Sequence, residues 1–268
     1  MTVFAFLLLT ATTLAGTPVA TVKPTTLTTS DGVTLQASLG APVKASANGV
    51  VFVPMIGRSR EDWVGVMGDC LKAGDFVLSF DLRGMGANVP VGTTAAPLVA
   101  ADYLKMTEDV KAAVALLKTK GVTKITLVGA ELGANLAANV AAEEPTVVDL
   151  VMLSPGMDYK GIISTDAVMR YGARPVFMVA SKDDPYGYQS VARLSQIATG
   201  DQKVDIFDDA GKGTKMLNRQ PELEGNIAGW VAAHWVVAAV TAPAVTPSLN
   251  VKTDKSEIET TGPTGFPQ

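Results

Sequence analysis

The stretch from Lys124 to Ala134, KITLVGAELGA, changes from a strand pattern to a helix pattern within a few residues. Its first part is apolar and rich in β-branched side chains, and its last part continues into an alanine-rich run. Gly129 and Gly133 stand on either side of Glu131, each two residues away. Glycine at both positions permits a sharp strand-to-helix turn, because small residues let the strand and the helix pack closely. The sequence therefore predicts that Glu131 stands at the end of a buried strand, with its side chain at the top of a sheet.

Apolar runs of strand length alternate with helical patterns along most of the chain. Residues 25–40 alternate apolar and polar side chains around Asp31-Gly32, which is typical of a hairpin. Strands that alternate with helices predict an α/β fold, in which a mostly parallel central sheet is covered by helices on both faces. The predicted strands are 49–54, 76–81, 125–128, 147–153, 175–180 and 203–207, and the predicted helices are 61–73, 102–120, 132–142, 187–198 and 222–239.

The two ends of the chain differ in composition from the α/β region, which we expect to form one domain over residues 21–240. Residues 3–14 are apolar or small and too few to span a bilayer comfortably, so residues 1–20 are typical of a signal peptide. No lysine or arginine precedes Lys23, which leaves open an uncleaved anchor or a misassigned start. We expect an exported bacterial protein, periplasmic or extracellular, with no transmembrane segment after cleavage. Residues 241–268 are rich in Pro, Thr, Ser and Lys and predict a disordered tail.

Charge and cysteine content exclude several classes of function. The formal net charge is −4, with acidic and basic residues interspersed, which argues against a nucleic-acid partner and against a polybasic membrane patch. A single cysteine, Cys70, excludes an internal disulfide, and we expect it to pack as a small apolar side chain. No CxxC motif or His/Cys cluster is present, so we predict neither a metal site nor another cofactor.

Several short segments follow one another in an order that is specific to one superfamily. Together with GAELG at 129–133, they resemble the loops and strand ends of the α/β-hydrolase superfamily, and most closely its dienelactone-hydrolase-like esterases. The resemblance covers residues 25–239 and implies an α/β-hydrolase fold with a G-x-S-x-G nucleophile elbow. The other segments are PMIGRSREDW at 54–63, SFDLRG at 79–84, LSPG at 153–156, ASKDDP at 180–185 and AGKGT at 210–214.

The resemblance assigns the three catalytic positions of such enzymes to unusual residues. Glu131 stands where the family has its nucleophilic serine, and Lys212 stands where a Gly-His-Gly pattern would place the general base. Asp184 stands where the acid orients the base, with Asp183 as a near-equivalent neighbour. The family order Ser, Asp, His thus becomes Glu, Asp, Lys. The only histidine, His234, lies between tryptophans on the last predicted helix, where a packing or surface role is far commoner than that of a displaced base.

The same resemblance assigns an oxyanion hole to backbone N–H groups. These would come from the region of Met55 and Ile56 and from Leu132, the residue after the elbow. Backbone donors survive the replacement of side chains, so they would bind either an anion or the Glu131 carboxylate itself. Met55, Ile56 and Met157 are also candidates to fill the pocket.

These replacements remove the chemistry of a serine hydrolase. Glutamate has no hydroxyl to deprotonate, and lysine, with an ordinary pKa of about 10.4, is a cation and a poor base at neutral pH. Haloalkane dehalogenases and epoxide hydrolases of the superfamily use a carboxylate at the elbow, but theirs is an aspartate assisted by a histidine. We therefore expect a non-catalytic binding or scaffold protein. The alternative is a hydrolase with altered or residual activity on ester-like or halogenated small molecules, with Glu131 as a carboxylate nucleophile.

Charge balance predicts how such a site would be stabilised. An unpaired buried carboxylate costs several kcal/mol, so we expect Lys212 to reach Glu131 from the adjacent loop and neutralise it. The site is then either an ion-paired relic of an active site or a place where the same charges hold a small polar ligand. The sequence favours neither version, and it identifies no protein partner.

Overall fold

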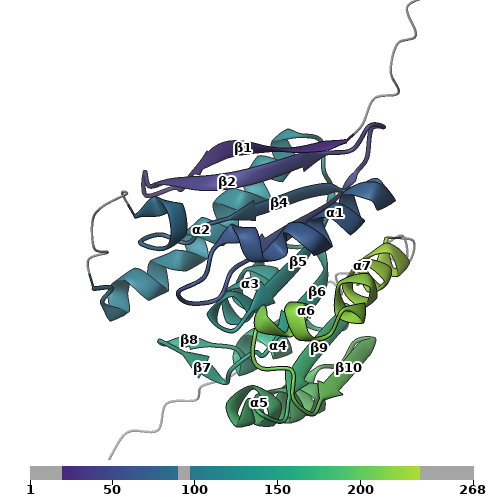
Figure 1. Cartoon of the computed structure of the whole chain (residues 1–268). Coiled ribbons are helices and arrows are strands. Elements are labelled where there is room, and N and C mark those ends of the chain that lie inside the picture. The colour runs from purple at the N-terminus through teal and green to yellow at the C-terminus, as the bar shows by residue number, and fades with distance from the viewer. Residues whose placement is uncertain (1–19, 90–96, 236–268) are drawn as a thin grey trace, which may run out of the picture. The chain divides into compact units, whose positions relative to one another are not determined.

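A mostly parallel eight-stranded sheet forms the centre of the protein in the computed structural model, which describes residues 20–89 and 97–235 (Figure 1). Its strands lie in the order β1-β2-β4-β3-β5-β6-β9-β10. The pairs β1–β2 and β2–β4 are antiparallel, and from β4 onward every pair is parallel. The strands are β1 (Thr21–Thr28), β2 (Thr34–Ala41), β3 (Asn48–Val53), β4 (Phe76–Phe80), β5 (Lys124–Ala130), β6 (Val147–Leu153), β9 (Val176–Ser181) and β10 (Gln202–Phe207).

Helices cover both faces of this sheet, as the alternating pattern predicted. One buried apolar cluster joins one face to α2 (Ala100–Thr119), α3 (Leu132–Glu143), α4 (Thr165–Tyr171) and α5 (Pro185–Ile197). A second cluster joins the other face to α1 (Val64–Ala73), α6 (Lys215–Arg219) and α7 (Glu222–His234). The central strands β3, β5 and β9 are buried almost throughout, which explains their continuous apolar runs. The predicted α/β fold is therefore confirmed.

Most predicted elements are present with small shifts at their ends. The hairpin around Asp31-Gly32 is formed by β1 and β2, and Gly32 adopts a φ of 84° in its turn. The segment predicted as a helix from residue 61 begins as a short 3-10 helix, Arg60–Trp63, before α1. Cys70 is buried in α1, as expected.

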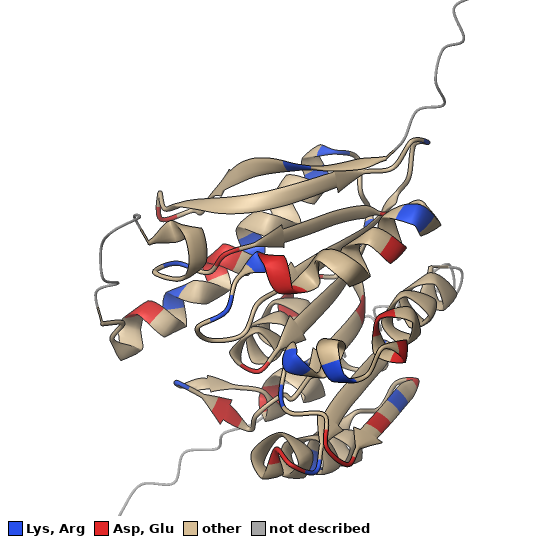
Figure 2. Cartoon of the chain, in the orientation of Figure 1, with Lys and Arg blue, Asp and Glu red and all other residues tan. Residues whose placement is uncertain are grey.

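Short elements escaped prediction because they contain too few residues to display a period. These are α4, α6, a second 3-10 helix (Gly86–Asn88) and a small hairpin of β7 (Asp158–Tyr159) and β8 (Ile162–Ile163). The expected signal peptide and tail, and the predicted helical residues 236–239, lie outside the described residues. None of the described helices is long and apolar enough to cross a membrane. Basic and acidic residues are intermixed along the ribbon (Figure 2).

Candidate functional site

Glu131 stands between the last residue of β5 and the first residue of α3, as the glycine spacing predicted. Its backbone has φ 49° and ψ −116°, a region that a residue with a side chain rarely adopts. A side chain at Gly129 would come within 3.0 Å of the Gly133 carbonyl, and one at Gly133 would come as close to the carbonyls at the end of β3. Both glycines are therefore required for α3 to start against the sheet, and Glu131 is held at its carboxyl-terminal edge.

The Glu131 side chain is buried and forms an ion pair with Lys212, as the charge argument predicted. The side chain of Glu131 is 3% exposed, and that of Lys212 is 46% exposed. Oε1 of Glu131 makes this contact, and no other described residue donates a hydrogen bond to it. The ammonium group is therefore the main compensation for the buried charge, and it reaches the carboxylate from the solvent side.

The aspartates at the predicted acid position do not complete a triad with Lys212. Among described carboxylates, only that of Glu131 lies within 4.0 Å of the Lys212 ammonium. Asp184 directly precedes α5 and is buried, and its Oδ2, which has no hydrogen-bond partner among the described residues, points toward Gly187, where a side chain would collide with it. Its neighbour Asp183 accepts two 3.1 Å hydrogen bonds from the N–H of Gly211, so Asp183 is the aspartate that contacts the Lys212 loop.

Asp183 is held in a network of its own beside this loop. The hydroxyl of Ser181 donates a hydrogen bond to it, and this bond lowers the pKa of the Asp183 carboxyl. Arg219, from α6, lies 3.6 Å from its other carboxylate oxygen. The carboxylate therefore fixes the backbone of the loop and does not orient the lysine.

Met55 fills the space between the elbow and the Lys212 loop. Its side chain is 3% exposed. A side chain at Gly213 would meet the Met55 sulfur at 2.7 Å and Cγ of Glu131 at 3.4 Å, so the three residues lie against one another. The Thr214 hydroxyl lies 3.4 Å from the same sulfur and donates a hydrogen bond to Asp62, at the start of the helix that follows Met55. The loop with the predicted base and the loop with the predicted oxyanion residues are thus joined over Glu131.

The predicted oxyanion residues lie where the resemblance placed them, but their role stays a prediction. Met55 and Ile56 directly follow β3, and Leu132 is the first residue of α3. These two segments touch, because Gly133 packs on the carbonyls of Val53 and Pro54.

Two further residues contribute to the site and were missed in the sequence. Ser154, at the end of β6, adopts φ 47°, and its Oγ accepts a 2.9 Å hydrogen bond from the N–H of Gly213. Tyr159 comes from the β7–β8 hairpin. Burial raises the pKa of its hydroxyl, and the nearby charges of Glu131 and Asp184 raise it further. Lys160 and Gly161 both adopt positive φ in the turn of this hairpin. A glycine at the second position of a two-residue turn is typical of a tight hairpin, and Gly161 was the signal available in the sequence.

The remaining candidates lie elsewhere. His234 is buried on α7, where its ring packs 4.0 Å from that of Trp230, so its expected packing role is confirmed. Among the described residues, no group of His, Cys, Asp and Glu side chains is placed to hold a metal ion.

Comparisons with known proteins identify the fold. A family model described as "Alpha/beta hydrolase family" matches residues 50–262. The chain belongs to this family. No curated protein matches the chain significantly.

Several solved hydrolase structures are similar to this chain at low sequence identity. The esterase Pf2001 of Pyrococcus furiosus has a TM-score of 0.65 and 18% identity, over 80% of this chain and 91% of the esterase. A dienelactone hydrolase from Anabaena variabilis has a TM-score of 0.61 and 17% identity, over 81% and 98% of the two chains. Est1E from Butyrivibrio proteoclasticus, solved with ferulic acid bound, has a TM-score of 0.64 and 17% identity, over 78% and 99%. At these identities the likeness shows the α/β-hydrolase fold alone.

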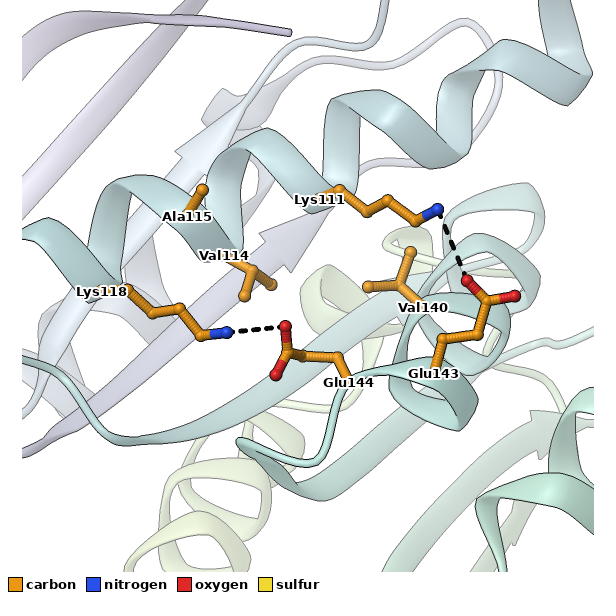
Figure 3. Close-up of a pocket in the computed structure, with 7 residues that line it drawn as sticks. All are labelled: Lys111, Val114, Ala115, Lys118, Val140, Glu143 and Glu144. Atoms are coloured by element: carbon orange, nitrogen blue, oxygen red, sulfur yellow. Dashed lines mark hydrogen bonds and ion pairs between the residues drawn. The ribbon is translucent and has the colours of Figure 1, made fainter. Parts of the chain in front are cut away.

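Within this hydrolase fold, two hollows between described residues lie away from the elbow. A hollow of about 270 Å³ lies between α2 and α3, and its two lysines pair with its two glutamates (Figure 3). A second hollow of about 430 Å³ lies along β1 and β2. Neither hollow is lined by any of the predicted site residues. Glu131 itself is in contact with Lys212 and lies against Met55 and Gly213.

Proposed function

We propose that this protein is an exported, non-catalytic member of the α/β-hydrolase family that acts as a binding or scaffold protein. The ion pair between Glu131 and Lys212, at the positions of nucleophile and base, is the observation that carries the proposal. Export is supported by the apolar run at residues 3–14.

The ion pair opposes both halves of ester hydrolysis. A carboxylate has no proton to give to a base, so Glu131 cannot form the alkoxide that attacks an ester. An ammonium ion bound to a carboxylate has no free electron pair, so Lys212 cannot take up a proton while the pair persists. No described carboxylate besides Glu131 lies close enough to Lys212 to orient it.

The packing around the pair favours a scaffold over a protein that binds a small ligand at this site. Met55 lies against Gly213 and Glu131, where a substrate would have to enter. Tyr159 approaches from the β7–β8 hairpin on the side of Asp184. A ligand that bound here would have to displace both apolar and charged contacts. A protein partner that bound elsewhere on the surface would displace none of them.

Activity assays with the purified protein test the proposal. With short-chain aryl esters we expect rates near background, and we expect no labelling by a fluorophosphonate probe. Turnover on the order of 1 s⁻¹ or faster, lost on Glu131→Gln, would contradict the proposal. It would support the alternative of a hydrolase that uses Glu131 as a carboxylate nucleophile, and halogenated substrates belong in the same panel.

Restoring serine and histidine at positions 131 and 212 tests whether the fold has kept the geometry of an active site and only the catalytic residues have changed. Glu131→Ser with Lys212→His should yield weak esterase activity, while either change alone should not, because nucleophile and base act as a unit. Adding Met55→Ala should raise the rate of the double variant by opening the site. Met169→Ala, which makes the same change at an exposed position of α4, is the matched control and should change it little. A folded triple variant that neither reacts with esters nor is labelled would show that the site is closed by more than Met55.

A further inference from the structure

The two edges of the central sheet are built differently. At one edge, β1 contains Pro24, and proline has no N–H to offer to another strand. At the other edge, β10 has the sequence QKVDIF, without proline or glycine, and no described strand pairs with its outer side (Figure 1). Natural proteins usually protect such an edge. Because no proline interrupts β10 and no described strand pairs with its outer side, its backbone N–H and C=O groups offer an interaction surface along this edge.

The pairing of β10 with β9 shows which side chain lies on which face. Lys203 and Asp205 stand beside Phe177 and Val179, which belong to the apolar cluster under α7. Val204 and Ile206 stand beside residues of the cluster under α5, yet they are 40% and 37% exposed. The edge strand thus presents two β-branched apolar side chains on one face and a basic and an acidic side chain on the other.

The charge pattern fits a second copy of the same strand. When two identical strands pair antiparallel around a two-fold axis normal to the sheet, directly opposite residues lie on the same face. The residue at the axis must then face itself, and only axes through Val204 or Asp205 keep most of the strand Gln202–Phe207 paired. An axis through Asp205 sets two aspartates opposite each other. An axis through Val204 sets each lysine opposite an aspartate.

We infer that the protein forms a two-fold symmetric dimer in which β10 pairs antiparallel with β10 of a second copy, centred on Val204. Lys203 and Asp205 already form a 3.1 Å ion pair within one chain, at side-chain exposures of 35% and 25%. In the dimer four charges of alternating sign lie side by side on the α7 face. The two Val204 side chains pack against each other on the α5 face, and the two sheets become one. Such self-complementary contacts are typical of two-fold interfaces.

Charge reversal with complementation tests this arrangement in the full-length purified protein. Sedimentation analysis should show a dimer that dissociates on dilution. Lys203→Asp leaves acidic side chains at both 203 and 205, and Asp205→Lys leaves basic side chains at both. Each variant alone should dimerise at least about tenfold more weakly, since like charges then face each other. An equimolar mixture of the two variants should recover a dimer containing one chain of each.

Matched controls separate this pairing from general charge effects and from misfolding. Lys72→Asp on α1 and Asp166→Lys on α4 make the same changes of charge at exposed positions, and both should leave the dimer unchanged. Circular dichroism and thermal melting establish that each variant folds. A wild-type protein that stays monomeric at high micromolar concentration would overturn the inference. So would folded charge variants that dimerise as well as the wild type, or a mixture that forms no heterodimer.

Discussion

Two buried carboxylates lie at opposite ends of the neighbouring strands β5 and β6, and they are stabilised in different ways. Glu131 follows β5 at the carboxyl-terminal edge, and its compensation is the ammonium group of Lys212. Asp149 lies near the start of β6 and is completely buried. It accepts hydrogen bonds from Nε1 of Trp230 at 2.8 Å, from the N–H of Leu150 at 2.9 Å and from the Thr126 hydroxyl at 3.3 Å.

The second carboxylate has a histidine, and not a lysine, as its nearby basic residue. His234 lies in α7 next to Trp230, and its Nδ1 is 2.8 Å from the Trp230 carbonyl, which can only accept a hydrogen bond. Burial raises the pKa of Asp149 to about 7, although the Trp230 hydrogen bond and the charge of His234 lower it. Glu131 is thus paired with a lysine, while the raised pKa of Asp149 lets that carboxylate take up a proton near neutral pH. The two sites should therefore respond to different perturbations.

Removal of the cation at the first site should have the largest effect. Lys212→Met leaves Glu131 buried without a counter-charge, and we expect the free energy of unfolding to fall by about 3 kcal/mol. Glu131→Gln in the same protein should restore most of this loss, because no buried charge remains. Denaturant unfolding of the two single variants and the double variant measures the coupling.

An exposed ion pair provides the control for this cycle. Lys182 pairs with Asp208 at 2.6 Å, with side chains that are 58% and 87% exposed. Lys182→Met should leave the free energy of unfolding almost unchanged, because exposed ion pairs contribute little to stability. Strictly additive effects of the changes at Glu131 and Lys212 would mean that the two residues do not interact.

Neutralising Asp149 should change how stability depends on pH. Because burial raises the pKa of Asp149 from 3.8 to about 7, the folded protein retains a proton that the unfolded chain releases near pH 4. Stability from this group is therefore present at low pH and is lost as pH rises through about 7, at up to about 1.4 kcal/mol per pH unit. Asp149→Asn, which resembles the protonated acid, should match the wild type near pH 4 and become progressively more stable than the wild type as the pH rises toward 7.

The exposed acid Asp166 is the matched control for this experiment. It pairs with Arg170 on the surface of α4 at a side-chain exposure of 65%. Urea unfolding from pH 4 to pH 8 should give nearly parallel curves for Asp166→Asn and the wild type. Parallel curves for Asp149→Asn as well would contradict the assignment of a raised pKa to Asp149.

The sequence predicted the first of these sites and not the second. Glu131 and Lys212 stand in motifs whose glycines fix the local backbone, and the order of those motifs fixes which loops meet. Asp149 lies within a continuous apolar strand, and nothing near it in the sequence indicates that Trp230 and His234 will pack beside it. Its environment depends on how α7 docks across the sheet, which is a property of the whole fold.

A similar limit explains the details that were missed at the elbow. Asp183 and Asp184 are adjacent in the sequence, and only the path of the chain into α5 decides which one faces the Lys212 loop. Tyr159 reaches the site on a hairpin of two-residue strands, too short to show an alternating pattern. The strands and long helices could be predicted because their periods extend over many residues.

Replacing His234 should change the stability less than replacing Asp149 does, and it tests how His234 acts on the Asp149 carboxyl. The charge of His234 lowers the pKa of Asp149, so His234→Gln should let that pKa rise. The pH range over which stability declines should then extend upward by a fraction of a pH unit, worth less than about 1 kcal/mol. Unfolding curves between pH 6 and pH 9 measure the shift. A downward shift would show that His234 acts on Asp149 mainly through packing or hydrogen bonding.

Salt should have the smallest effect and should act on only one of the two sites. Lys212 is half exposed, so dissolved ions can approach its ammonium group, whereas Asp149 is fully buried. Raising the ionic strength from about 0.1 M to about 1 M shortens the screening length from about 10 Å to about 3 Å. The coupling energy between Glu131 and Lys212 should then decrease by about 0.5 kcal/mol, as expected for a pair that is partly solvated.

The stability difference between Asp149→Asn and the wild type at neutral pH should stay unchanged, because protonation of a buried group involves no exposed partner. If salt instead reduced that difference and left the Glu131–Lys212 coupling intact, the contrast between the two carboxylates would be reversed, with the lysine pair shielded from solvent and the aspartate open to it.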